Sequence, residues 1–375
     1  MAKARALSDR PDAWVDVGMA WMRQLRVAGD SGYALNADAC ARVALELAPD
    51  QRRALGLSAQ VRLDAHEFAR ARELAEAVLA REPEDAGALG TLSDATLELG
   101  DVAAASAAAQ KLLDVAPGLA AYARAAYLRW LHGDEPGALE MARLAIDAAG
   151  DPDEVDARAW LLVQTAHLFW HRGDVEGAAA GYRMALDVRA EYAPALLGLG
   201  KVAIAEQRYR DAAEQLGRAL ASHADVETAA LLGEVLQQLN DAAGASRHEA
   251  QVEQLGRHDR RAHALFLANR RIAAERAVGL ARAELEVRGD VYTEDALGWA
   301  LYAAGQLEEA EQHAARATRL GTRDALLDYH LGAIQLARGK LAEGRASLDR
   351  ALRQNPHFDR AGAADARRLL ERAGS

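Results

Sequence analysis

Apolar residues along this chain recur with the spacing of amphipathic helices, in pairs of helical segments separated by turns. Pro49, Pro83 and Pro117 stand 34 residues apart, and each follows a segment rich in Ala and Leu. No run alternates between apolar and polar residues with period two, as a half-buried strand would. The pattern therefore predicts an all-α chain built from two-helix repeats of about 34 residues.

The same period continues beyond Pro117 as a pattern of small residues. A turn residue is followed five positions later by Ala or Gly and seven positions after that by Ala, Val or Leu, as in Gly173, Ala178 and Ala185. Gly or Asn lets the chain leave the first helix in a left-handed conformation, and the small residues let the second helix approach closely. Nine units fit well, and their turn residues are Gly32, His66, Gly100, Gly133, Gly173, Gln207, Asn240, Gly305 and Gly339.

A tenth, less regular unit is predicted over about 257–290, with Asn269 in its turn. The small residues behind that turn are Ala274 and Ala281. The first part of this unit, 257–271, is a candidate hinge between the repeats on either side.

The predicted domain organisation is one long repeat domain with short ends. Its parts are an N-terminal tail at 1–12, the repeats at 13–356 and a final helix at 357–375. The apolar side of that helix consists of Phe358, Ala361, Leu369 and Leu370. We expect it to cover the end of the last repeat, because a repeat stack needs a terminal helix with a polar outer face.

The repeated pattern of turn residues and small residues resembles that of the tetratricopeptide-repeat family over roughly 13–356 of the chain. The segments that match the repeat signature best are GLGKVAIAEQRYRDAAEQLGRAL at 198–220, LGWALYAAGQLEEAEQHAARA at 297–317 and YHLGAIQLARGKLAEGRASLDRAL at 329–352. The resemblance implies an all-α, right-handed superhelical solenoid of about ten helix-turn-helix repeats with a C-terminal capping helix. It does not imply one function, since the family serves many unrelated processes.

Residues 3, 6, 10 and 13 positions before each turn residue form one stripe of the first helix, and by resemblance to the family this stripe lines a concave, peptide-binding face. Most of the scarce aromatic residues fall on it, in two patches at 119–190 and 291–340. Trp and Tyr dominate binding hot spots. The candidate groove residues are Tyr127, Trp130, Trp160, His167, Trp170, Lys201, Tyr292, Trp299, Tyr302 and Tyr329.

The polar residues of the stripe predict the kind of ligand. Repeats that clamp a terminal carboxylate present several lysines and asparagines, whereas Lys201 is the only lysine here and no asparagine lies on the stripe. We therefore expect apolar or aromatic anchors in the ligand, together with Arg or Lys side chains. The carboxylates that could receive those cations include Asp94, Glu98, Glu234 and Asp295.

The net charge of −11 argues against a nucleic acid as the partner, because phosphates would be repelled overall. One stretch is basic, at 257–271. Its arginines are Arg257, Arg260, Arg261, Arg270 and Arg271. Two interpretations stay open: a solvated helix face beside an irregular joint, or a docking site for an acidic segment of a partner.

Enzymatic and metal-binding motifs are weak. His167 and His171 stand four residues apart, a spacing that can share a zinc ion, but the metalloprotease pattern with its Glu is absent. No GxxxxGK[ST] or GxSxG motif occurs. Cys40 is the only cysteine, which excludes an intramolecular disulfide. We therefore predict no enzyme, no cofactor and no metal.

The sequence also predicts a compartment. The first residues, MAKARALSDRPDAW, contain no apolar signal region, and no stretch approaches the roughly 18 apolar residues of a membrane span. We expect a cytoplasmic protein without membrane insertion. The excess of Arg over Lys and the abundance of Ala are typical of a GC-rich bacterial gene.

Three functions compete on this basis. The first is an adaptor that holds a peptide or protein segment in an aromatic-lined groove. The second is a self-assembling homo-oligomeric scaffold, and the third is a peptide-responsive sensor that acts by releasing a partner. The partner's identity is not encoded in a pattern whose strongest signals are steric.

Overall fold

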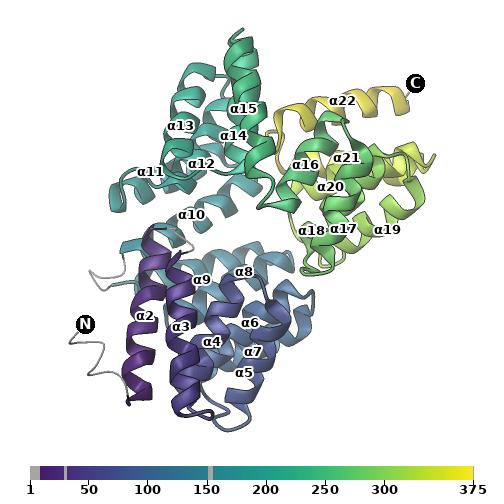
Figure 1. The fold of residues 1–375 in the computed structure, drawn as a ribbon. Coiled ribbons are helices and arrows are strands. Elements are labelled where there is room, and N and C mark those ends of the chain that lie inside the picture. The colour runs from purple at the N-terminus through teal and green to yellow at the C-terminus, as the bar shows by residue number, and fades with distance from the viewer. Residues whose placement is uncertain (1–8, 29–31, 151–154, 375) are drawn as a thin grey trace. The chain divides into compact units, whose positions relative to one another are not determined.

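The computed structural model describes residues 9–28, 32–150 and 155–374, and most of these residues are helical (Figure 1). Twenty-one helices and no strand occur within these ranges. The all-α prediction is confirmed.

Consecutive helices form ten pairs, followed by a final helix. The pairs are α2 (Pro11–Ala28) and α3 (Gly32–Leu47), α4 (Arg52–Asp64) and α5 (Phe68–Leu79), α6 (Ala86–Glu98) and α7 (Val102–Val115), α8 (Leu119–Leu131) and α9 (Glu135–Ala148), α10 (Val155–His171) and α11 (Val175–Val188), α12 (Ala193–Ala205) and α13 (Tyr209–Ser222), α14 (Val226–Gln238) and α15 (Ala242–Leu255), α16 (Arg260–Arg270) and α17 (Ala274–Leu285), α18 (Val291–Ala303) and α19 (Leu307–Ala317), and α20 (Ala325–Ala337) and α21 (Leu341–Gln354). The final helix is α22 (Arg360–Gly374). The predicted number of repeats is therefore confirmed over the described residues.

The turns follow the predicted steric pattern. Positive φ angles occur at the predicted turn residues His66, Gly100, Gly133, Gly173, Gln207, Asn240, Gly305 and Gly339. Gly32 is instead the first residue of α3, and the residues just before it lie outside the described ranges. The two small residues behind each of the nine regular turns are buried, so the second helix of each pair packs closely on the first.

The tenth, irregular repeat turns two residues later than predicted. Asn269 lies inside α16, and the positive φ angles belong to Arg271 (52°) and Ala273 (46°). The Asn269 side chain is engaged elsewhere, because it accepts a hydrogen bond of 2.7 Å from the indole nitrogen of Trp299. Ala281 is buried as predicted, whereas Ala274 is the first, only partly buried residue of α17.

The chain divides into two compact units. The first comprises the residues up to Ala125 together with Val287–Gly289, and the second comprises Ala126–Glu286 and the residues from Asp290 onward. Within the first unit, helices α2, α3 and α4 enclose a core that includes Val15, Met22 and Leu57. The tripeptide at 287–289 joins this unit through a hydrogen bond of 2.7 Å from the Gly289 amide to the Glu98 carbonyl oxygen.

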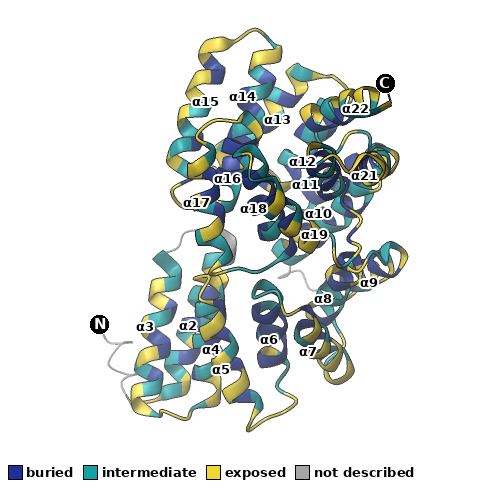
Figure 2. Cartoon of the chain, turned by 90° about the vertical axis from the view of Figure 1, so that its right-hand side faces the viewer, coloured by how far each residue is buried: buried dark blue, intermediate teal, exposed yellow. Residues whose placement is uncertain are grey.

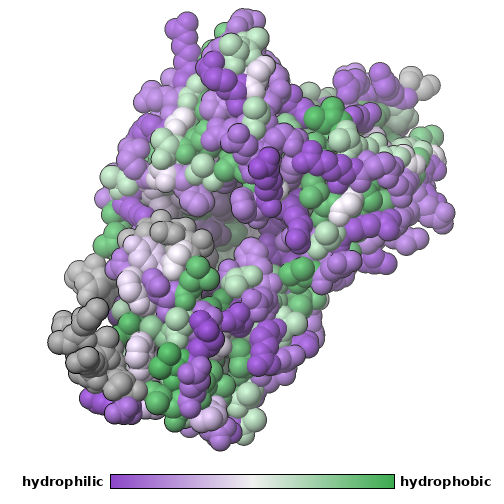
Figure 3. All heavy atoms as spheres, in the orientation of Figure 1, coloured by the Kyte–Doolittle hydropathy of each residue, from purple (hydrophilic) through white to green (hydrophobic). Residues whose placement is uncertain are grey.

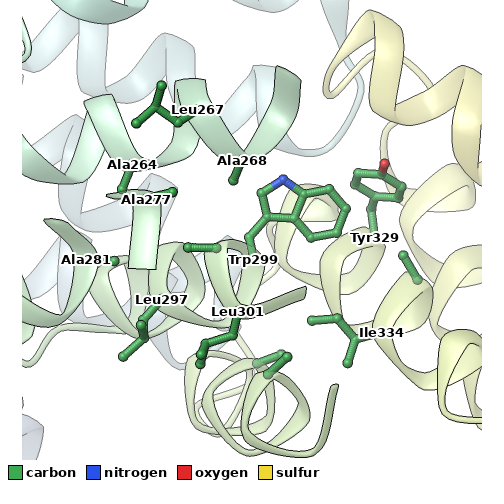
Figure 4. Packing of buried hydrophobic residues seen from close by; sticks show 14 of the residues in the cluster. Ala264, Leu267, Ala268, Ala277, Ala281, Leu297, Trp299, Leu301, Tyr329 and Ile334 are labelled. Atoms are coloured by element: carbon green, nitrogen blue, oxygen red, sulfur yellow. The ribbon is translucent and has the colours of Figure 1, made fainter. Parts of the chain in front are cut away.

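The core of the second unit runs through its last repeats (Figure 2, dark blue). Figure 4 shows Trp299 of α18 pointing toward Tyr329 of α20, with Leu297 and Leu301 on the helix of Trp299. Buried Ala264 and Ala277 allow α16 and α17 to pack beside them. The small side chains and the large rings together fill this core.

Helix α22 covers the end of the last repeat, as predicted for a capping helix. It buries Gly362, Ala363 and Ala366. Phe358, Leu369 and Leu370 pack against the core of the second unit. Ala361, assigned to the apolar side from the sequence, is exposed, because Gly362 and Ala363 occupy the inward positions of this turn.

Candidate functional site

All ten predicted groove residues lie in the second unit, but most of them are not open to solvent. Trp130, Trp170, Trp299 and Tyr329 are buried. The half-buried residues are His167, Lys201, Tyr292 and Tyr302. Only Tyr127 and Trp160 are exposed, with 38% and 43% of their surface accessible. The stripe residues therefore do not line a continuous open groove, and their role in partner binding stays a prediction.

The first aromatic group forms around Trp130. Its ring lies 5.7 Å from that of Tyr127, 4.9 Å from that of His171 and 6.3 Å from that of Tyr292, measured between centroids. Tyr292 belongs to the second patch predicted from the sequence, at 291–340. The two patches are therefore in contact at Trp130, whereas the sequence pattern presented them as separate.

Polar groups gather beside this aromatic group. Asp324 precedes α20 and accepts a hydrogen bond of 3.0 Å from the Leu326 amide. Its other neighbours are His171, whose Nδ1 lies 3.6 Å from Oδ1, and Tyr292, whose hydroxyl donates to Oδ2 at 3.5 Å. Burial raises the pKa of Asp324, but His171 and the Leu326 amide outweigh it and hold the pKa below its usual range. Burial and the Asp324 charge raise the pKa of Tyr292, which stays a neutral phenol.

Lys201, Glu227 and His167 lie near these polar groups. We call them, together with Asp324, His171 and Tyr292, the inner polar cluster. The Lys201 ammonium lies 2.5 Å from a Glu227 carboxylate oxygen. Burial lowers its pKa, but Glu227 and nearby aspartates raise it more, so the side chain stays charged. Burial, with the charges of Lys201 and His171, lowers the pKa of His167 to about 3. A permanent cation and a neutral imidazole are suited to binding polar groups, since a general base works best with a pKa near neutrality.

The second aromatic group belongs to the core. Trp299 stacks on His330 with the ring centroids 4.0 Å apart, and it also contacts Tyr302 and Tyr329 at 4.9 and 5.4 Å. Asp295 fixes His330 through a buried contact of 2.9 Å. The polar atoms of these buried side chains are thus used within the chain, as stable packing requires.

The four predicted anchor carboxylates differ in their availability. Asp94 pairs with Arg124 at 2.6 Å, Glu98 lies 2.6 Å from Arg288, and Asp295 pairs with His330. Among the described residues, Glu234 forms no ion pair. Burial and the nearby Asp359 raise its pKa. Three of the four carboxylates are therefore engaged by side chains of this chain.

The five arginines of 257–271 do not form one basic patch. Arg261 pairs with Asp290 at 3.0 Å, and Arg270 pairs with Glu249 at 2.8 Å. Arg271 lies over the Tyr302 ring at the C-terminal end of α16. The remaining two, Arg257 and Arg260, are exposed near its N-terminal end. The arginines lie at the two opposite ends of α16, so one acidic segment of a partner would have to span this helix to contact them all. The docking role and the hinge predicted here stay predictions.

Sequence reasoning missed a set of contacts between distant repeats, which we call the clasp. It joins Leu131–Gly133 and Trp170–Gly173 to 321–324 and 354–355, all within the second unit. Thr322 Oγ1 donates to the Leu131 carbonyl oxygen at 2.6 Å, and Asn355 Nδ2 donates to that of Trp170 at 2.8 Å. These residues are 191 and 185 positions apart. No feature of a 34-residue period signals such contacts.

No single apolar patch stands out on the face of the molecule that Figure 3 shows. On the face shown in Figure 3, hydrophilic residues predominate and apolar residues lie scattered among them. None of the helices in the described ranges is long and apolar enough to cross a bilayer.

Comparisons with known proteins agree with the fold. No family model and no curated protein matches the chain. Among solved structures, the human IFIT1 dimer with m7Gppp-AAAA aligns with a TM-score of 0.57 and 16% identity, covering 83% of this chain and 72% of that one. Cut9 from the APC/C complex Cut9–Hcn1 aligns with a TM-score of 0.40 and 14% identity, covering 96% and 87%. Yeast Tom70 aligns with a TM-score of 0.37 and 12% identity, covering 98% and 96%. The ten helix pairs and the IFIT1 alignment together show that the chain has the fold of the tetratricopeptide-type helical-repeat proteins.

Proposed function

We propose that this protein is a non-enzymatic adaptor that holds a segment of a partner protein. The observation that carries the proposal is the exposure of Trp160 on α10. An exposed indole offers a large, rigid contact area, which is why Trp is enriched in binding hot spots. Among the described residues, Trp160 makes no ring contact, unlike Trp130 and Trp299.

The surroundings of Trp160 support a binding surface. Asp156 lies one helical turn away on the same face of α10 and pairs with Arg189 at 2.8 Å. Arg189 in turn lies over the Tyr192 ring, 5.0 Å from its centroid. We call Trp160, Asp156, Arg189 and Tyr192 the Trp160 platform. Aromatic and ionic groups side by side suit a protein segment with an apolar anchor and flanking polar residues.

Helix α10 contributes Trp160 and Asp156 to this platform near its N-terminal end. It has 17 residues, whereas the first helices α8 and α12 of the neighbouring repeats have 13. All three run to the turn of their own repeat, so the additional turn lies at the N-terminal end of α10. Trp160 is close to that end, far along the helix from the clasp residue His171.

Capped RNA, the ligand in the IFIT1 structures, is not carried over to this chain. The net charge of −11 opposes phosphate binding. The inner polar cluster contains Glu227 and Asp324 beside its single lysine. We keep the prediction of a cytoplasmic protein as part of this proposal.

Replacement of Trp160 by Ala tests the adaptor. Because the ring is exposed, the variant should fold, while a partner captured from lysate by the wild type should bind at least roughly thirtyfold more weakly, as for a typical hot spot. The control is Met184→Ala, which removes an exposed apolar side chain from α11. Partner identity by mass spectrometry and affinity by calorimetry are the measurements.

Two results would contradict the proposal. Equal affinity of the Trp160→Ala variant and the wild type for the partner would show that the partner does not bind at the Trp160 platform. Recovery of the protein alone would favour the self-assembling scaffold, and light scattering over a concentration series would then reveal growth of the particles.

A further inference from the structure

The clasp departs from the rule that each unit of a repeat protein contacts only its neighbours. It connects the turns after α8 and α10, in the fourth and fifth repeats, to the loop before α20 and the end of α21. Gln354 Nε2 adds a third hydrogen bond, to the His171 carbonyl oxygen at 3.3 Å. The His171–Asp324 contact and the Trp130–Tyr292 stack lie beside these bonds.

Two turn glycines show how closely the backbones approach. A Cβ atom on Gly133 would lie 2.6 Å from the Gly321 carbonyl oxygen, and one on Gly173 would lie 2.9 Å from that of Gln354. Gly305 and Gly339 have similar φ angles of 78° but no atom within 4 Å of such a Cβ. The turns that enter the clasp therefore need glycine for space as well as for conformation, as does the turn at Gly100 of the first unit, where a Cβ would meet the Gly289 carbonyl oxygen.

The composition of the clasp is that of a contact that can open. It consists of loop residues and the helix ends beside them, joined by three side-chain-to-carbonyl hydrogen bonds, the His171–Asp324 contact and the stacked rings of Trp130 and Tyr292. Small polar interfaces within a chain permit relative motion, whereas large apolar ones prevent it. Opening would break a few bonds and leave the helix pairs intact.

The inner polar cluster behind the clasp gives a reason for opening. The Lys201 side chain keeps 28% of its surface accessible and that of Glu227 keeps 51%, although burial alone would lower the pKa of Lys201. Charged groups are rarely retained inside a permanently closed interior, because their desolvation is costly. Lys201, Glu227 and His167 therefore line a polar interior that solvent or a ligand can reach.

We propose that the clasp is a gate: the second unit exchanges between a closed state, held by Thr322 and Asn355, in which the inner polar cluster is partly accessible, and an open state in which it is more widely exposed. The gate is a property of the chain itself and does not depend on the Trp160 platform or on any identified partner. A failure of the adaptor proposal would thus leave the gate intact, and the reverse also holds.

Spin-label distances in the full-length protein test the gate. Cys40 is replaced by Ala, and labels are attached at Glu176→Cys and Arg353→Cys, two exposed positions that flank the contact of Gly173 with Gln354. Pulsed electron resonance then measures the distance distribution. We expect a dominant short distance and a minor long one.

Variants of the clasp should change the ratio of these two populations. Thr322→Val keeps the side-chain shape but loses the donor to Leu131, and Asn355→Asp loses the donor to Trp170. Each should raise the long population about tenfold relative to the short one, the effect of one lost buried hydrogen bond. Thr318→Val is the matched control, because its hydroxyl bonds only within its own helix turn, to the carbonyl oxygens of Ala314 and Ala315.

The gate is overturned by either of two results. The first is a distribution that Thr322→Val and Asn355→Asp leave unchanged although circular dichroism shows both variants folded. The second is a single short distance in the wild type and in every variant, which would make the clasp a permanent closure. An equal response to Thr318→Val would likewise contradict a specific role of Thr322.

Discussion

At the scale of the residue, His167 shows how position decides chemistry. It stands four residues before His171, and the sequence alone allows both rings to face one ligand. In the structure, His167 lies edge-on to Tyr182 with the ring centroids 5.7 Å apart, while His171 contacts Trp130 and Asp324. Burial, Lys201 and His171 keep the His167 ring neutral. The two imidazoles therefore have different surroundings.

The lowered pKa of His167 predicts a pH-dependent stability. Its folded pKa of about 3 lies below the ordinary value near 6.5, so only the unfolded chain takes up a proton in this window. The free energy of unfolding should fall as the pH drops from about 6.5 toward 3, by up to about 1.4 kcal/mol per pH unit. His167→Gln removes this contribution. Urea unfolding at several pH values should show the variant losing less stability than the wild type.

A matched variant separates this effect from general acid destabilisation. His223 is exposed, so His223→Gln should follow the wild-type pH dependence. Parallel curves for His167→Gln and the wild type would show that the His167 ring is protonated as easily in the folded protein as in the unfolded chain.

At the scale of the element, the residue after each turn decides how the second helix begins. After four of the turns an aspartate accepts a hydrogen bond from the backbone amide three positions on. These caps are Asp101, Asp134, Asp174 and Asp241. After the turn at His66, Glu67 occupies the same position but makes no side-chain cap. One additional methylene group places its carboxylate away from the first amides of α5.

Glu67→Asp should therefore stabilise the protein by about 0.5–1 kcal/mol through a new N-cap. The change keeps the charge, and the pair of Glu67 with Arg62 five residues earlier has a direct model in Asp134, which caps α9 and pairs with Arg129 at 2.8 Å. Urea unfolding measures the gain. The reciprocal change, Asp134→Glu, should lose a similar amount, and an opposite sign in both variants would refute the capping argument.

The helix pairs could be predicted from the sequence because their cause is local. The buried small residues behind the turn recur in all nine regular units, and the positive φ at the turn residue recurs in eight of them, so one steric rule predicts most of the repeats. The rule failed at Asn269 for a tertiary reason, the hydrogen bond from Trp299 across 30 positions. Helix boundaries thus follow the sequence pattern unless a distant side chain forms a hydrogen bond with the residue expected in the turn.

The site was less predictable because stripe position does not determine exposure. Trp160 and Trp170 both belong to the stripe before Gly173, yet Trp160 is exposed and Trp170 is buried. Trp170 lies at the turn end of α10, where its carbonyl oxygen accepts the hydrogen bond from Asn355. The clasp that distinguishes the two rings depends on contacts more than 180 positions apart, and these leave no periodic trace in the sequence.

At the scale of the whole molecule, each repeat is stabilised by the next, so the last one needs a cover. Helix α22 supplies it, with Phe358 5.4 Å from the Tyr329 ring and Asp365 accepting a hydrogen bond of 3.0 Å from the Tyr329 hydroxyl. Removing 357–375 should expose Tyr329 and the apolar groups around it. We expect a lower melting temperature and concentration-dependent association, measured by calorimetry and light scattering.

The control for this deletion changes only the outer face of the helix. Ala364 is exposed on α22, so Ala364→Glu should leave both melting and particle size unchanged. If the truncated protein melts like the wild type and stays monodisperse, then the tenth repeat is stable without a cover. The clasp, which holds Asn355 against the fifth repeat, would then be the remaining physical explanation for the stability of the truncated protein. In that case Asn355→Asp should destabilise the truncated protein far more than it destabilises the full chain.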